Sequence, residues 1–227
     1  MSKPSLYLQE EIMLLALRDE EGTVPLAASG YPYANGAAIL AELLLAEQIA
    51  VVEEKGKEYV VAKGDGASLE SPLLKECLQK IRKANRSDIE RWVVRFASLP
   101  KLKHRVAKGL CEKGILRAED ERVFLAFKRR VYPEIDHGPE KTLIGKLERA
   151  IFEDDTKPVR RTAALIAIAD SVELLSIPFS GQSIKKRKKR IHQIANGEIY
   201  AEGSRDAYEP IKSIVDAVSS NVVVFRN

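Results

Sequence analysis

Apolar residues recur at helical spacing along most of the chain. In the stretch LYLQEEIMLLALRDEEG, Leu8, Ile12 and Leu15 fall on one helical face, and Gly22 marks the end of the pattern. The stretch GAAILAELLLAEQ, residues 36–48, is apolar on nearly every side, which is typical of a deeply buried helix. The same spacing predicts further helices at 72–84, 87–97, 102–113, 140–152, 159–175, 184–195 and 207–218.

Two segments have the β-branched runs of strands instead. The stretch IAVVEEKGKEYVVAKG, residues 49–64, predicts a hairpin around a turn from Glu54 to Lys57. A second hairpin is expected to pair ILRA, residues 115–118, with RVFLAF, residues 122–127, around the turn EDE.

The stretch VPLAASGYPYANG, residues 24–36, is rich in Gly, Pro and small residues, and it is predicted to be a loop. No Pro-, Gly- or Ser-rich linker divides the rest of the sequence, so one domain over residues 1–227 is expected. The expected fold class is mainly α: a single-domain helical bundle with two short β-hairpins.

The amino-acid composition excludes few classes of function. The chain is 45% hydrophobic and 31% charged, as an ordinary globular protein is, and its net charge of +4 mildly favours phosphate-bearing partners. Cys77 and Cys111 belong to no CxxC motif, so free thiols in a reducing compartment are expected. Because the sequence has no apolar signal or membrane-spanning run, we expect an intracellular protein whose membrane contacts are peripheral.

Catalytic and metal-binding patterns are missing from the sequence. The histidines His104, His137 and His192 are far apart, and no HExxH, GxSxG or GxxxxGK[ST] motif occurs. We therefore expect no enzymatic activity, no cofactor and no metal ion.

One cationic cluster opens the helix predicted after Pro100. Lys101, Lys103 and Arg105 lie in or next to its first turn, where cationic side chains and free backbone N–H groups can share an anion. A solvated positive face is the alternative interpretation of this cluster.

A second cationic cluster is the run KKRKKR, which lies opposite the apolar positions Ile184, Ile191 and Ile194 and makes a basic amphipathic helix. We interpret it as an auxiliary, non-specific charge patch that lies against a bilayer or in water. Its members are Lys185, Lys186, Arg187, Lys188, Lys189 and Arg190.

The stretch VFLAFKRR places Phe124, Leu125 and Phe127 next to three cations. An exposed aromatic tip beside cations suits a membrane anchor or a contact between subunits. A half-buried strand with a solvated flank is the other interpretation, because alternation along a strand buries every second side chain.

The order helix, isoleucine, hairpin occurs twice, in ILAELLLAEQIAVVEEKGKEYVVA and in RVAKGLCEKGILRAEDERVFLAF. Winged-helix DNA-binding domains have this order, so a nucleic-acid-binding protein is one alternative. The helix of the first copy has almost no Lys or Arg for phosphates and bases, which disfavours that alternative. The other alternative is an oligomeric, protein-only scaffold that self-associates through VFLAF.

Four stretches, in this order and in register, resemble the Golgi phosphoprotein 3 family: LYLQEEIMLLALRDEEG, ILAELLLAEQI, RVAKGLCEKGIL followed by FLAF, and RRTAALIAIADSVELL. The resemblance implies a mainly helical, non-enzymatic adaptor that binds phosphatidylinositol 4-phosphate as a peripheral membrane protein. Eukaryotic relatives act on the cytosolic face of the Golgi, where they bind cytosolic tails of membrane proteins. Their hairpin is implicated in oligomerisation and membrane insertion.

The resemblance also implies where a lipid headgroup binds. The tryptophan of the family pocket falls on Ala27, and its three arginines fall on Gly36, Pro100 and Lys103, so only Lys103 keeps a cation. A lysine is a point charge and cannot reproduce the bidentate fork of an arginine. With Lys101 and Arg105 restoring charge nearby, we expect a divergent homologue that binds phosphoinositide or other anionic headgroups; a prokaryotic source is one interpretation of the divergence.

Overall fold

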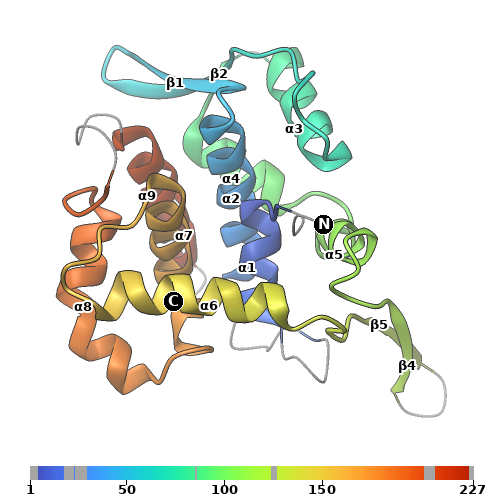
Figure 1. Ribbon diagram of the computed structural model, residues 1–227. Coiled ribbons are helices and arrows are strands. Elements are labelled where there is room, and N and C mark those ends of the chain that lie inside the picture. The colour runs from blue at the N-terminus through green and yellow to red at the C-terminus, as the bar shows by residue number, and fades with distance from the viewer. Residues whose placement is uncertain are drawn as a thin grey trace.

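The computed structural model describes residues 5–17, 23, 30–84, 86–123, 127–201 and 208–224, and at 122, 123, 127, 128 and 222–224 the backbone alone. Within these residues the chain is mainly helical with two short antiparallel hairpins, which confirms the expected fold class (Figure 1). The helices are α1 (Leu8–Ala16), α2 (Tyr31–Leu45), α3 (Pro72–Lys83), α4 (Ile89–Ala97), α5 (Leu102–Glu112), α6 (Gly138–Phe152), α7 (Arg160–Ser171), α8 (Gly181–Ala195) and α9 (Glu209–Val224). No helix among them is long and apolar enough to cross a bilayer.

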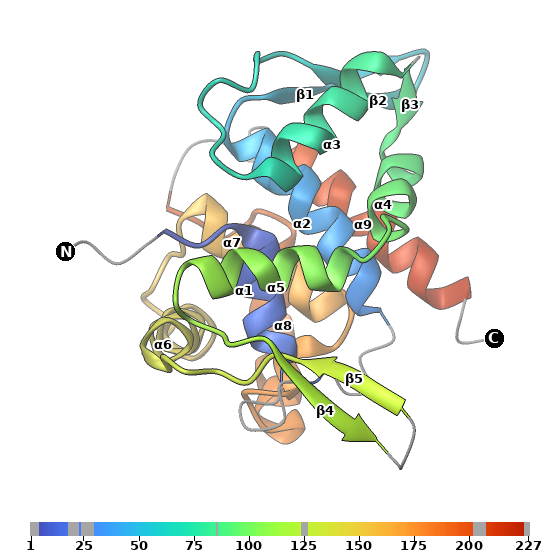
Figure 2. The same ribbon diagram turned by 90° about the vertical axis from the view of Figure 1, so that its right-hand side faces the viewer.

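Helix α2 is the centre of the core. It packs against α1, α4, α7 and α9, which surround it in Figures 1 and 2. Every residue from Ala34 to Leu43 is buried, as the apolar pattern on all sides of this segment predicts.

The start of α2 corrects one prediction. Residues 31–36, expected in a loop, form its first turns, because Gly30 is the N-cap and Pro32 lies in the first turn, where a proline is favourable. Gly36 is needed for packing instead of for a turn. A Cβ atom at Gly36 would lie 2.4 Å from the carbonyl oxygen of Val93 in α4, so only glycine allows the two helices to approach this closely.

The first hairpin is confirmed. Strands β1 (Ile49–Glu54) and β2 (Lys57–Ala62) are antiparallel, and Lys55 and Gly56 between them have φ of 53° and 73°, as a tight primed turn requires. A short strand, β3 (Ser87–Asp88), adds to β2 where the helix was expected to begin. Helix α4 therefore starts two residues later, capped by the Asp88 carboxylate, which accepts from the Arg91 backbone N–H at 2.8 Å.

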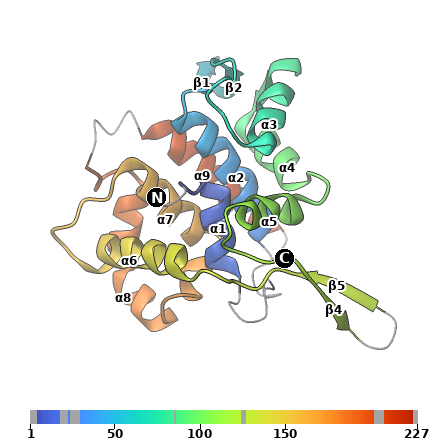
Figure 3. The same cartoon turned by 45° about the vertical axis from the view of Figure 1, so that its right-hand side comes forward.

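The second hairpin has a different register from the predicted one. Its strands are β4 (Glu119–Val123) and β5 (Phe127–Val131), so the expected turn EDE lies within β4. Opposite charges face each other across the strands, with Asp120 opposite Arg130 and Glu121 opposite Arg129, and such pairs stabilise a register. The hairpin extends away from the helices in Figures 2 and 3.

All four helices of the C-terminal half differ from their predicted ranges: α6 starts two residues early, at Gly138, and α9 runs from Glu209 to Val224, six residues beyond its predicted end. Helix α7 ends at Ser171, four residues early, because Glu173 has φ of 62° and a short 3-10 turn follows it, η1 (Leu174–Ser176). Helix α8 starts three residues early, at Gly181, because the Ser180 hydroxyl caps it by accepting from the Ser183 backbone N–H at 3.2 Å.

A pair of glycine substitutions tests the close approach of α2 and α4. We expect Gly36→Ala to lower the free energy of unfolding by about 2 kcal/mol, because the added methyl group meets backbone atoms. Gly145→Ala in α6 is the control. Nothing lies within 4 Å of its added Cβ, so the free energy of unfolding should rise by about 0.5–1 kcal/mol through the gain in helix propensity. Urea unfolding measures both, and equal effects of the two variants would contradict the packing role.

Candidate functional site

The first cationic cluster lies at the start of α5. Lys101 is the N-cap residue, with φ of 56°, and no side chain caps the amides of the first turn. Neither Lys101 nor Lys103 forms an ion pair with another of the described residues. An unpaired ammonium group beside uncapped helix amides favours binding of an anion.

Arg105 does not share this environment. Its guanidinium group forms an ion pair with Glu76 of α3 at 2.5 Å, and this contact lowers the pKa of the Glu76 carboxyl group. Arg105 is therefore engaged with α3, whereas Lys103 has Arg129 of the hairpin as its charged neighbour. The structure therefore separates Arg105 from the two lysines that the sequence placed with it.

Strand β5 brings further cations to the start of α5. Burial and the charge of Arg129 lower the pKa of the Lys103 ammonium group. Burial and the charges of Lys103, Arg130 and Lys101 lower the pKa of the His104 imidazole. We call these five residues, from one helix and one strand, the α5–β5 cluster.

The α5–β5 cluster is held by contacts of its own members. The Nδ1 atom of His104 is hydrogen-bonded to the Tyr132 hydroxyl at 2.7 Å, which joins α5 to the end of the hairpin. Arg129 pairs with Glu121 at 2.6 Å and Arg130 with Asp120 at 2.5 Å, so both guanidinium groups have fixed positions. Sequence analysis noted the run KRR but did not connect it with α5, about 25 residues earlier in the chain.

The aromatic stretch VFLAF is described only in part. Phe124 and Leu125 are outside the described residues, and of Phe127 the backbone alone is described, opposite Val123. The membrane or oligomer contact of these three residues therefore stays a prediction.

The run of six cations on α8 is divided between two roles, which corrects its interpretation as one solvent-facing patch. Arg190 is buried and donates to the carbonyl oxygens of Ala150, Asp154 and Thr156, the first at 2.9 Å. Arg187 donates to the carbonyl oxygen of Ile151 at 2.8 Å and to Phe152 at 2.9 Å. The last carbonyls of α6 have no partners within their helix, so the two arginines supply donors and favourable charge at its C-terminus.

The four lysines of the same run remain exposed: Lys185, Lys186, Lys188 and Lys189. Helix α8, which carries them, lies away from the hairpin in Figures 1 and 3. The auxiliary patch is therefore smaller than predicted and separate from the α5–β5 cluster.

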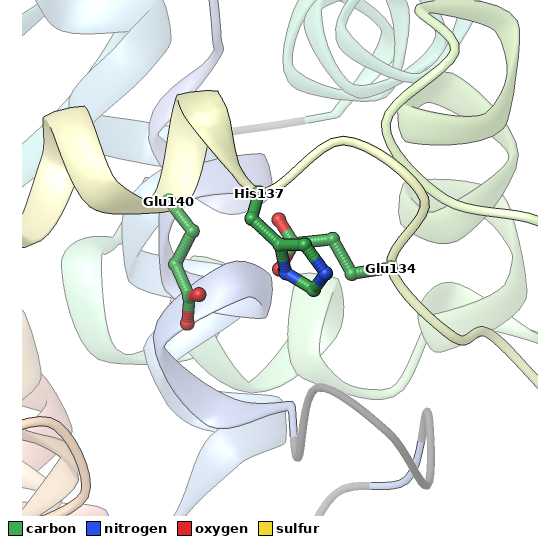
Figure 4. A group of neighbouring side chains, drawn as sticks. All are labelled: Glu134, His137 and Glu140. Atoms are coloured by element: carbon green, nitrogen blue, oxygen red, sulfur yellow. The ribbon is translucent and has the colours of Figure 1, made fainter.

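A group that sequence analysis missed lies at the start of α6. Glu134, His137 and Glu140 bring their ligand atoms within 4.8 Å of one another (Figure 4). The His137 Nδ1 atom is hydrogen-bonded to the Glu134 carboxylate at 2.9 Å, so a metal ion would have to replace an existing contact. Three-residue spacing in PEIDHGPE was the available signal, and searches for adjacent histidine pairs overlook it. We assign no metal to this group.

Substitutions on α8 test the different roles of its cations. Arg190→Met should lower the free energy of unfolding by about 3 kcal/mol, because three carbonyl groups lose a charged donor. Arg190→Lys should recover little of this loss, since an ammonium group cannot reach three oxygens in the same geometry. The neighbouring Lys189→Met should change it by less than about 0.5 kcal/mol. Thermal or urea unfolding gives all three values, and a neutral Arg190→Met would contradict the assignment.

Comparisons with known proteins agree with the resemblance found in the sequence. The family model described as Golgi phosphoprotein 3 (GPP34) matches residues 8–211. Vacuolar protein sorting-associated protein 74 of Eremothecium gossypii is 24% identical over 250 residues, which cover 97% of this chain and 75% of the relative. The protein of the same name from Schizosaccharomyces pombe is 23% identical over 222 residues, which cover 85% of this chain and 66% of the relative. Because the family model matches most of its length, this chain belongs to the Golgi phosphoprotein 3 (GPP34) family.

Proposed function

We propose that this protein is a peripheral membrane adaptor that binds anionic lipid headgroups, such as phosphatidylinositol 4-phosphate, through the α5–β5 cluster. The observation that carries the proposal is a group of neighbouring cations. Lys101 and Lys103 have no ion pair with a described residue, and two arginines and a histidine lie beside them. Cations that repel one another are stabilised when an anion binds between them. Membership of the family supports the same function.

The guanidinium groups of β5 are suited to replace those that α5 lacks. Pro100 and Lys103 stand where the family resemblance places arginines, and a lysine binds phosphate as a point charge only. Arg129 lies near enough to lower the pKa of Lys103, and its fork can donate two parallel hydrogen bonds to a phosphate. In this proposal Glu121 orients Arg129 until an anionic headgroup binds.

The position of the hairpin indicates which side of the protein would face a membrane. It extends from the helices in Figures 2 and 3, and the stretch VFLAF includes its end. We propose that this end enters the interfacial region of a bilayer while the cations at the base of the hairpin reach headgroups. Each cation near an anionic surface contributes about 1 kcal/mol.

Two alternatives receive less support from the structure. Of the two helix–hairpin copies behind the winged-helix alternative, the first would use α2 as its recognition helix, but Ala34 to Leu43 are buried, so that helix cannot enter a DNA groove. A protein-only scaffold that associates through Phe124 and Phe127 predicts that Phe124→Ser with Phe127→Ser lowers the oligomer mass and leaves vesicle binding unchanged. We propose no catalytic activity. Family membership leads to two further proposals: the protein binds cytosolic tails of membrane proteins, and several copies of it associate.

Liposome flotation tests the headgroup site. Lys101→Glu with Lys103→Glu should weaken binding to vesicles containing phosphatidylinositol 4-phosphate or phosphatidylserine by at least roughly 30-fold, because about 1 kcal/mol of attraction is lost for each lysine and each new carboxylate is repelled by the surface. Arg129→Ala should weaken binding to the phosphatidylinositol 4-phosphate vesicles more than to phosphatidylserine vesicles, since a phosphate monoester accepts the fork better.

Lys75→Glu with Lys83→Glu on α3 is the matched control, because both lysines are exposed and the net charge changes equally. The control should bind nearly as the unmodified chain does. If the unmodified chain floats equally with neutral and acidic vesicles, or if both double variants lose binding equally, the α5–β5 cluster is not the headgroup site.

The pKa of His104 gives a second test. Neighbouring cations and burial lower it, so an anion bound among those cations should raise it again. A pKa that is higher in the bound state means that binding tightens as pH falls through the range between the two pKa values, and this gain is lost above the bound value. Flotation on phosphatidylserine vesicles at pH 7.5 and pH 5.5 should show tighter binding at pH 5.5, and His104→Gln should reduce the difference. An unchanged difference in His104→Gln would exclude His104 from the site.

A further inference from the structure

The exposed lysines of α8 lack the counter-charges that lysines on other helices have. On α3, α5 and α9 a lysine lies within 3.5 Å of a carboxylate four residues away: Lys80 with Glu76, Lys108 with Glu112, and Lys212 with Asp216. Helix α8 has no acidic residue from Gly181 to Ala195. Its four exposed lysines form no ion pair with any residue that the structure describes. We call them the α8 lysine face: Lys185, Lys186, Lys188 and Lys189.

The spacing of these lysines makes them repel one another. Lys185 lies three residues before Lys188 and four before Lys189, so side chains that are neighbours on the helix surface carry like charges. Like charges at these spacings destabilise a helix, and a negatively charged surface close to them removes that cost. The α8 lysine face is therefore suited to an anionic partner.

Carboxylates on the neighbouring elements offset only part of this charge. Asp154 is paired with Arg187 at 2.6 Å, so it is engaged by another member of the run. Burial raises the pKa of the Asp170 carboxyl group on α7, the charge of Lys188 acts in the opposite direction, and Glu173 raises it further. Two carboxylates at the end of α7 thus stand beside four lysines, and the face keeps a net positive charge.

The α8 lysine face points away from the hairpin. Helix α8 packs against α6 and α7 and buries Ile191 and Ile194, so its exposed lysines lie on the outer sides of the helix. Helices α6 and α7 lie between α8 and the hairpin in Figure 1, and Figure 3 shows the same separation. A surface that contacts the hairpin and a surface that contacts α8 would therefore be on different sides of the protein.

A bilayer suits this face better than a nucleic acid does. Arg187 and Arg190 donate to carbonyl oxygens at the end of α6, so they are not available for bidentate contacts with base edges. Helix α8 has no Phe, Tyr or Trp on which bases could stack. Lysine ammonium groups are point charges, and they attract an anionic leaflet without any particular geometry.

We propose that the α8 lysine face binds a second anionic bilayer, so that one molecule joins two membranes. The hairpin and the α5–β5 cluster hold the first bilayer, and the lysines of α8 hold the second. The inference rests on the proposed function, because it takes the contact with the first bilayer from it.

Capture of one vesicle population by another tests the inference on the full chain. Phosphatidylserine vesicles with a biotin-labelled lipid are fixed to streptavidin beads, the chain is added, and fluorescent phosphatidylserine vesicles follow. We expect the chain to hold these vesicles on the beads and to hold no fluorescent phosphatidylcholine vesicles. Lys185→Glu with Lys189→Glu should lower capture about tenfold or more, because two attractions to the second bilayer become repulsions. The amount of chain on the beads should change less than about twofold, since the α5–β5 cluster is unaltered.

Two matched variants separate the α8 lysine face from charge in general. Lys75→Glu with Lys83→Glu changes the net charge equally on α3 and should leave capture unchanged. Lys185→Arg with Lys189→Arg keeps the charge and should keep capture, because attraction to a leaflet does not need a particular cation. Thermal unfolding establishes that all three variants are folded.

The result on the beads also separates this inference from the proposed function. If the chain binds the beads but captures no vesicles, or if Lys185→Glu with Lys189→Glu captures as many as the unmodified chain does, the α8 lysine face binds no second bilayer. If an equal concentration of a DNA duplex releases the captured vesicles while the chain stays on the beads, the face is a nucleic-acid site instead. If the chain does not bind the beads at all, the proposed function itself is wrong.

Discussion

Helix α2 carries apolar or small side chains around its whole circumference, and only neighbouring helices can remove that surface from water. Four helices satisfy this requirement, and each must approach α2 closely along a short contact. Gly36 marks the closest place, where the backbones of α2 and α4 touch. Charged groups that enter this region are paired: Glu42 accepts from the Leu8 backbone N–H at 2.6 Å and binds Arg161 of α7. The positions of α1, α4, α7 and α9, and of everything attached to them, follow from covering this one helix.

Several cations of this protein serve the fold itself. The guanidinium groups of Arg187 and Arg190 at the end of α6, and of Arg161 on α7, each donate to several oxygens at once, and Arg105 pairs with Glu76 of α3. The lysines of the α8 run and Lys101 are exposed instead, and Lys103 is half-buried. The net charge of +4 therefore does not show where the positive surface lies. Two arginines of the α8 run are engaged at the end of α6, whereas cations of α5 and β5 lie close together at the start of α5.

The candidate headgroup site was predicted in part. Lys101 and Lys103 were identifiable because a proline and a helix start follow one another there, and both features are local. Arg129 and Arg130 could be seen as cations, but their approach to Lys103 and His104 depends on how the hairpin folds back towards α5. Arg105 was placed with the wrong partners, because Glu76 is 29 residues earlier in the chain and nothing in the local pattern indicates their contact.

The sequence by itself determined that the chain is mainly helical, which segment is buried on all sides, and where the first hairpin turns. Apolar periodicity and turn residues are local properties, and they exist before any tertiary partner is present. Tertiary structure alone decided how closely α2 and α4 approach, and the pairing of strands decided which register β4 and β5 adopt, because a residue on the neighbouring element settles each of them: Val93 opposite Gly36, and Arg129 opposite Glu121. It also decided which members of the run KKRKKR face water, since that depends on the free carbonyl groups at the end of α6. Contacts between residues distant in the chain cannot be derived from periodicity, because each helix face admits many partners until the whole core is assembled.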